Sequence, residues 1–197
     1  MKTFALVLAA ALLAPAAASA EAHATLPAGE AATGAESIYQ LDGTYTDQDG
    51  RQMRLSDLRG KPVLISMFYG TCPHACPMLI SDLKRVEAAV PPEVREKLQV
   101  VLVTFDPERD TPASMKALRD AHLVDARRWT MLRTEPERVQ ELAAVLGIKY
   151  RFAPGGAINH STVITLLDEN GAIVERLDGL RQPEAPIVAK LTAKAAR

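Results

Sequence analysis

The sequence predicts an α/β domain built on a mixed β-sheet, and three features of the chain support this prediction. Two continuous apolar segments, "PVLISMF" (62–68) and "LQVVLVTF" (98–105), have the length and β-branched content of strands buried on both faces. Segments with helical periodicity separate the strands along the chain. A late segment, "STVITLLDENGAIVERL", predicts an antiparallel hairpin that turns at Asn170-Gly171.

Residues 1–20 have the pattern of a secretory signal peptide. Lys2 precedes the apolar segment "FALVLAAALLAPAAASA", and Ala18 and Ala20 form the A-x-A arrangement that precedes cleavage. This segment is short and Pro15 interrupts it, so cleavage after about Ala20 is favoured over a transmembrane anchor. We therefore expect an exported protein.

The composition narrows the range of functions. The 197-residue chain carries a formal net charge of −1, which predicts no nucleic-acid partner. Two cysteines are too few for a disulfide scaffold, and the 48% hydrophobic content is sufficient for a core without one. Residues 21–37 lack helical periodicity and predict a flexible leader, in which His23 is expected to be solvated. The folded domain is expected over residues 38–197.

The first half of this domain contains two short strands, a buried strand, a helix and a second buried strand. Apolar and polar residues alternate around Asp49-Gly50, which predicts an N-terminal β-hairpin. The buried strand 62–68 ends just before the cysteines. A helix is predicted to begin between Pro73 and Pro77 and to end before Pro91-Pro92, because apolar residues recur between these limits at helical spacing.

The second half alternates helices with a strand and the late hairpin. Thr111 is the predicted N-cap of a helix that has Pro112 in its first position. A short strand is expected over residues 129–132. Thr134 and Glu137 then have the spacing of a capping box, for a helix that Gly147 ends. The last element is a helix over "PEAPIVAKLTAKAA".

Both cysteines, Cys72 and Cys76, lie in the segment "TCPHACP" between the first buried strand and its helix. Thioredoxin-like domains carry their active thiols at this position, so we predict a thioredoxin-like fold. The spacing of four residues places both sulfurs on one side of the helix start, where they can meet each other or one metal ion. Backbone N–H groups there should lower the pKa of both thiols. A structural disulfide across so short a loop would stabilise little.

Two thiolates leave a soft cation such as Cu(I) short of a third ligand. Among the four histidines, His160 is the strongest candidate because it ends the Gly-rich segment "PGGAINH" directly before a predicted strand. A histidine hydrogen-bonded at a strand entrance is the alternative interpretation. His74 is predicted to point away from a site shared by the cysteines, and His122 is predicted to interact favourably with a helix C-terminus.

Three segments occur in an order that resembles the Sco/SenC family, and the resemblance spans residues 38–180. They are "TCPHACP", "FDPERDTP" (105–112) and "NHST" (159–162). The resemblance implies a thioredoxin-like copper protein of the periplasm that helps to assemble the dinuclear copper centre of cytochrome c oxidase. By position, Cys72, Cys76 and His160 would be the copper ligands, and the partner would be a copper-receiving protein such as the copper subunit of that oxidase.

The match also includes an acidic segment and two departures. Asp106 and Asp110 match the acidic loop of the family, although Asp110 could equally cap the following helix. Many family members carry aspartate where this chain has His74, and many have a membrane anchor where this chain has a predicted signal peptide.

Other functions use the same residues. Cys72 and Cys76 could serve as the catalytic thiols of a thiol–disulfide oxidoreductase, which needs no histidine. The three-residue spacing, in place of C-x-x-C, and His160 favour metal binding. A peroxidase of the peroxiredoxin class needs a threonine three residues before its cysteine, where this chain has Tyr69 or Pro73. A copper sensor or store would share the ligands of a metallochaperone.

Overall fold

The computed structural model describes residues 37–195. The predicted signal peptide and His23 lie outside these residues, as does the predicted leader except for its last residue, Ser37. Ser37 is the N-cap of a 3-10 helix, η1 (Ile38–Gln40), and its side chain accepts a hydrogen bond from the Tyr39 N–H. Ser37 therefore belongs to the folded domain.

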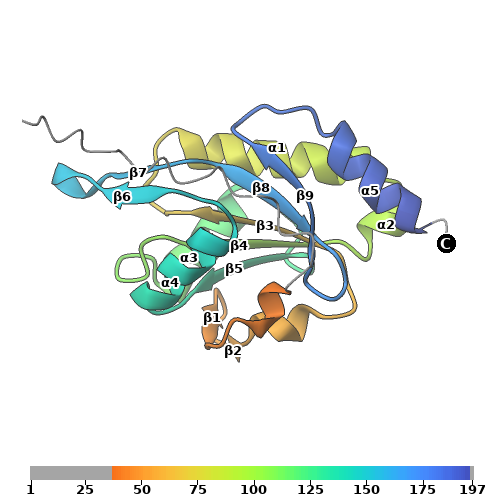
Figure 1. Ribbon diagram of the computed structural model, residues 1–197. Helices are drawn as coiled ribbons and strands as arrows, with labels where there is room; N and C mark the ends of the chain where they lie inside the picture. Colours follow the sequence, from red (N-terminus) through yellow and green to blue (C-terminus); the bar gives the residue numbers. More distant parts are fainter. Residues whose placement is uncertain (1–36, 196–197) are drawn as a thin grey trace, which may run out of the picture. The chain divides into compact units, whose positions relative to one another are not determined.

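The centre of the domain is a seven-stranded sheet in the order β2-β1-β5-β4-β3-β8-β9 (Figure 1). Its parallel part pairs β3 with β4 and β4 with β5, whereas β1–β5, β3–β8 and β8–β9 are antiparallel. The predicted mixed sheet is therefore confirmed. The strands are β1 (Tyr45–Asp47), β2 (Gln52–Met53), β3 (Val63–Phe68), β4 (Gln99–Thr104), β5 (Trp129–Arg133), β8 (Val163–Leu167) and β9 (Ile173–Asp178).

Helices flank this sheet and explain the continuous apolar sequence of its central strands. Every side chain of β3 is buried, as are five of the six in β4. α1 and α5 contact each other beside the sheet (Figure 1). The helices are α1 (Ala75–Ala89), α2 (Pro92–Arg95), α3 (Pro112–Ala121), α4 (Pro136–Val145) and α5 (Ala185–Ala195). None of the helices found within residues 37–195 is both long and apolar enough to cross a membrane.

The helix boundaries confirm one predicted cap and correct another. Thr111 caps α3 by accepting a hydrogen bond from the Ser114 N–H at 3.2 Å. The capping box predicted at Thr134 is wrong, because α4 has Pro136 in its first turn and Glu135 as its N-cap. The Thr134 hydroxyl instead donates to the Thr44 carbonyl at 2.9 Å. Proline favours the first helical position, and this preference sets where α4 begins.

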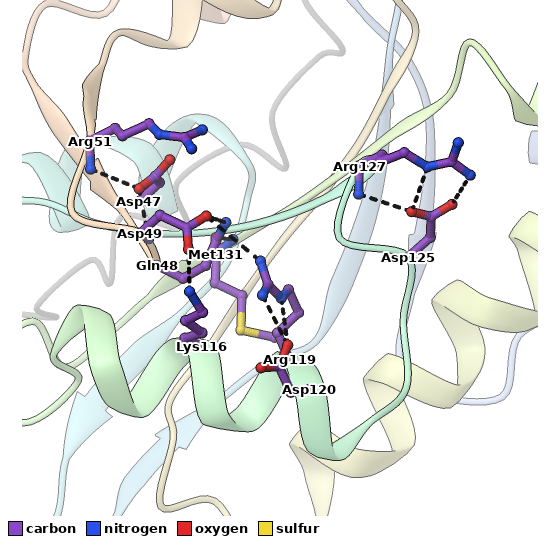
Figure 2. A network of polar contacts seen from close by, with 10 residues as sticks. All are labelled: Asp47, Gln48, Asp49, Arg51, Lys116, Arg119, Asp120, Asp125, Arg127 and Met131. Carbon is purple, nitrogen blue, oxygen red and sulfur yellow. Dashed lines mark hydrogen bonds and ion pairs between the residues drawn. The ribbon is translucent and has the colours of Figure 1, made fainter.

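The predicted N-terminal hairpin forms and is tied to the body of the domain (Figure 2). The Gln48 side-chain oxygen accepts a hydrogen bond from the Met131 N–H of β5 at 2.7 Å. The Asp49 carboxylate pairs with Lys116 of α3 at 2.9 Å, and the buried Arg119 guanidinium lies near the same carboxylate. These contacts anchor α3, and with it the end of the acidic segment that precedes α3.

Several elements were not predicted, among them a second, two-stranded sheet in the segment expected to be a Gly-rich loop. β6 (Tyr150–Phe152) pairs antiparallel with β7 (Ile158–His160), and the 3-10 turn η3 (Pro154–Gly156) joins them. Figure 1 shows this hairpin extending from the main sheet on the side where α1 begins. His160 is therefore held by a strand. Another 3-10 helix, η2 (Leu55–Leu58), was also not predicted.

Candidate metal centre

The two cysteines lie where the chain passes from β3 into α1. His74 is the N-cap of α1, so Cys72 precedes the helix and Cys76 lies in its first turn. Both are free thiols, and the Cys76 backbone N–H donates a hydrogen bond to the Cys72 sulfur at 3.3 Å. Cys76 is buried and Cys72 is partly buried. The predicted juxtaposition of the two sulfurs at a helix start is confirmed.

His160 joins the two cysteines although it comes from the distant β6–β7 hairpin. The sulfurs of Cys72 and Cys76 and a ring nitrogen of His160 all lie within 4.8 Å of one another. Metal–sulfur bonds of about 2.3 Å and metal–nitrogen bonds of about 2.0 Å, as zinc forms, separate two ligands of one ion by at most about 4.6 Å. Two sulfurs and one imidazole also match the preference of copper for soft and nitrogen ligands. The arrangement therefore fits a single copper ion with little rearrangement.

The environment of His160 leaves one ring nitrogen available for a metal. Nδ1 lies 3.0 Å from the Ser161 carbonyl, which can only accept, so a proton on Nδ1 would complete this hydrogen bond. Nε2 then presents its lone pair. The ring packs against Phe105 with 4.9 Å between centroids and meets Tyr69 edge-on at 5.8 Å. In known metal sites the second nitrogen of a histidine ligand makes such a hydrogen bond, and here this contact and the two aromatic rings hold the His160 ring.

The two thiols differ in acidity, which corrects the prediction that the helix start lowers both pKa values. Burial raises the pKa of Cys72, but hydrogen bonds from the Cys76 backbone and side chain, the His74 backbone and Tyr69 outweigh it, and the pKa of Cys72 falls below its usual value. Burial raises the pKa of Cys76 far above its usual value, and the nearby Cys72 raises it further. Desolvation exceeds the effect of the helix N-terminus at the deeper position.

We expect iodoacetamide to alkylate Cys72 before Cys76 in the metal-free, reduced protein. Because the pKa of Cys72 is lowered, its thiolate forms at a lower pH than that of free cysteine. The alkylation rate of Cys72 should therefore begin to rise at a lower pH than the rate of free cysteine. Cys76 should react slowly throughout, because it is protonated and buried. Mass spectrometry that locates the label on Cys72 or Cys76, carried out at a series of pH values, measures both alkylation rates. Urea-unfolded protein is the control. Equal rates in the folded protein would contradict the assignment.

The acidic segment supports the cysteine loop through Asp110, which is buried. Its two carboxylate oxygens accept hydrogen bonds from the Gly70 N–H at 3.1 and 3.0 Å, and the Thr104 hydroxyl donates to the same carboxylate. Burial raises the pKa of Asp110 above its usual value, although these hydrogen bonds oppose the shift. A side chain at position 70 would collide with this carboxylate. The helix-capping interpretation of Asp110 is wrong, because Thr111 is the cap.

The other described histidines lie outside the group of three. His74 is exposed, and its side chain makes no capping hydrogen bond. His122 is the C-cap of α3, but burial and the nearby Lys84 lower its pKa, so its charged form is not favoured as predicted. The His122 carbonyl instead accepts a hydrogen bond from Lys84 at 3.1 Å.

Some residues around the site were not singled out from the sequence. Phe105 and Tyr69 follow buried strands, and nothing in their spacing indicates that they contact a histidine of another hairpin. Arg109 lies within the segment "FDPERDTP", where only the two aspartates were considered. The only sequence feature that could have drawn attention to Arg109 is its place in a motif shared with a known family.

Comparison with known proteins adds a family match over most of the chain. Residues 32–196 match the family SCO1/SenC. A Stutzerimonas stutzeri protein that is provisionally named for copper binding is 29% identical over an alignment of 157 positions, and the match covers 74% of each chain. The mitochondrial SCO2 homolog of Bos taurus is 28% identical over 75% of this chain, but the match spans only 56% of the bovine protein.

Solved structures agree with the observed architecture. Bradyrhizobium japonicum ScoI with copper bound has a TM-score of 0.65 and 26% identity over 77% of this chain and 96% of its own. A SCO1/SenC family lipoprotein from Bacillus anthracis has a TM-score of 0.71 and 22% identity over 80% of this chain and 95% of its own. The second likeness shows the fold, which is thioredoxin-like as predicted.

Proposed function

The chain belongs to the SCO1/SenC family, and on this basis we propose that it is an exported copper-binding metallochaperone with Cys72, Cys76 and His160 as its ligands. Its role would be to deliver copper to the dinuclear centre of cytochrome c oxidase, or to help assemble that centre. The main support is the meeting of two sulfurs and one imidazole within 4.8 Å. The copper bound to the related Bradyrhizobium protein supports the choice of metal.

The ligand set suits copper in both oxidation states. Cu(I) is a soft ion and is well served by the two thiolates, whereas Cu(II) gains more from the imidazole nitrogen. Cys72 has a lowered pKa and supplies a thiolate readily. Cys76 must lose its proton as the metal binds, since metal ions bind the deprotonated sulfur. Copper uptake should therefore release protons.

The predicted export places the site in an oxidising compartment, proposed to be the periplasm. Free thiols that lie this close together form a disulfide there unless a reductant or a metal holds them open. Reduction would then precede copper loading. The proposed partner is a copper-receiving protein such as the copper subunit of the oxidase, and contact with a membrane would occur through that partner or through an uncleaved N-terminal segment.

A second candidate function, thiol–disulfide exchange with a copper-receiving partner, is favoured by the different positions of the two thiols. Cys72 is the more exposed sulfur, and a backbone N–H stabilises its thiolate. It would attack a partner disulfide, and Cys76 would then displace the partner from the mixed disulfide. The partner disulfide becomes two thiols as Cys72 and Cys76 form their own disulfide.

An anaerobic titration followed by native mass spectrometry tests the metallochaperone proposal. The reduced, metal-free protein should bind one Cu(I) per chain, because the two sulfurs form a single site. Absence of uptake after complete thiol reduction would contradict it. The exchange function is tested separately, by turnover of a disulfide substrate with metal-free protein and with each single serine variant of the two cysteines.

A further inference from the structure

The β6–β7 hairpin positions His160 although neither of its strands pairs with a strand of the main sheet. Its two strands pair with each other and form a sheet of their own. Lys149 and Ser161 close its base through hydrogen bonds of 2.8 and 2.9 Å. An isolated two-stranded hairpin is only marginally stable in water. Contacts with the rest of the domain must therefore determine where its side chains lie.

Arg109 makes such a contact at the far end of the hairpin. Its Nη2 donates a hydrogen bond to the Gly156 carbonyl at 2.6 Å, while its Nε pairs with the Asp106 carboxylate. Among residues 37–195, this is the hydrogen bond that links the turn 153–157 to another segment of the chain. A planar guanidinium can hold two acceptors at once in a fixed geometry, which a lysine cannot do.

The same contact completes a chain of hydrogen bonds between the two ligand-bearing segments. Gly70, beside the cysteines, donates to Asp110, and Thr104 also donates to Asp110. The Asp106 N–H donates to the Thr104 hydroxyl at 2.9 Å, and the Asp106 carboxylate holds Arg109. Asp106, Asp110 and Thr104 are buried, so this support is rigid. Arg109 extends it to the hairpin that bears His160.

Gly156 leaves room for this approach. A Cβ atom at position 156 would lie 2.6 Å from Nη1 of Arg109, so a larger residue would displace the guanidinium. The preceding glycine has the same backbone angle, with φ of 81° at both positions, but a Cβ atom there would meet nothing within 4 Å. The two glycines therefore separate backbone strain from loss of the arginine contact.

We propose that Arg109 is a positioning residue that holds the β6–β7 hairpin against the acidic segment and so keeps His160 within reach of the two sulfurs. The predicted influence of Arg109 on copper binding rests on the function proposed above, whereas its predicted influence on the position of the hairpin does not. The side-chain hydrogen bonds of Arg109 go to Asp106 and Gly156, so it acts through the turn that it binds.

Arg109→Ala should lower the affinity for Cu(II) by up to about 10-fold, the lower end of the cost of losing an outer-shell partner of a metal ligand, because Arg109 holds the turn and not the ligand itself. The affinity for Cu(I) should change much less, because the two thiolates supply most of its binding. In the metal-free protein, hydrogen–deuterium exchange over residues 153–160 should become faster. Arg109→Lys should restore little, since an ammonium group cannot hold both acceptors in the same geometry.

Two controls separate this role from a general effect on folding. Arg138→Ala removes a guanidinium of similar exposure, 41% against 46%, from another i,i+3 ion pair, and should leave both readouts unchanged. Gly156→Ala should reproduce the effect of Arg109→Ala, whereas Gly155→Ala should show only the cost of backbone strain. Combining Arg109→Ala with Gly156→Ala should add to Arg109→Ala only the strain that Gly155→Ala shows, because both changes remove the same arginine contact.

Unchanged exchange and unchanged Cu(II) affinity in folded Arg109→Ala would overturn the proposal. Equal effects of the two glycine variants would also overturn it, and this comparison remains decisive if Arg109→Ala does not fold. If the unaltered protein binds no copper, the function proposed above fails, while the exchange measurements on metal-free protein still decide the role of Arg109.

Discussion

Replacing either cysteine is expected to abolish tight Cu(I) binding and the visible absorption of the Cu(II)–thiolate complex. Cys72 and Cys76 supply the two soft ligands of the proposed site, and a single thiolate with one imidazole is a poor substitute. Anaerobic competition with a Cu(I) chelator measures the first effect, and absorption spectroscopy of the Cu(II) form measures the second. Retention of the colour in both serine variants would show that copper binds elsewhere.

The choice of replacement matters at Cys76, because this residue is only 2% exposed. Cys76→Ser places a hydroxyl in a buried position and should lower the free energy of unfolding by about 1–3 kcal/mol if that hydroxyl lacks a partner. Cys76→Ala removes the sulfur without burying a polar group, so it is the matched control. Both variants should lose Cu(I) to the same extent, and loss in the serine variant alone would indicate a folding defect.

His160→Ala is expected to lower the affinity for Cu(II) at least about 100-fold, the upper end of what the loss of an outer-shell partner costs. Its effect on Cu(I) should be far smaller, because Cu(I) depends mainly on the sulfurs. Titration of each oxidation state against a chelator of known affinity gives the two values. His122→Ala is the control, since His122 caps α3 and does not belong to the group formed by Cys72, Cys76 and His160. Equal losses for both oxidation states would show that His160 does not discriminate between them.

If the cysteines dominate Cu(I) binding and His160 matters mainly for Cu(II), the site would have a means of releasing copper. If sulfur atoms contribute most to Cu(I) binding and a nitrogen atom contributes more to Cu(II) binding, the affinity of the site for copper changes when copper is oxidised or reduced. Cys72 and Cys76 lie where β3 of the main sheet passes into α1, whereas His160 comes from a hairpin outside the main sheet. Variants of the hairpin should therefore alter Cu(II) binding more than Cu(I) binding.

Patterns between neighbouring residues predicted most of the fold. The buried strands β3 and β4, the hairpin turn at Asn170-Gly171 and the Thr111 cap all depend on residues close together in the sequence. The capping box at Thr134 failed because Pro136 two residues later also has a positional preference, and the Thr134 hydroxyl found a partner in the N-terminal hairpin. The β6–β7 hairpin was missed because its strands are short and its turn resembles a loop.

The sequence by itself determined the mixed α/β fold, the position of two cysteines at a helix start and, through resemblance to a family, the histidine that accompanies them. These depend on periodicity, spacing and motif order, which are local properties of the chain. Only the tertiary structure decided the unequal acidity of the thiols, the aromatic contacts of His160 and the hydrogen bonds that run from Gly70 to Gly156. Burial and contacts between distant segments set these properties, and neither is encoded in the spacing of residues along the chain.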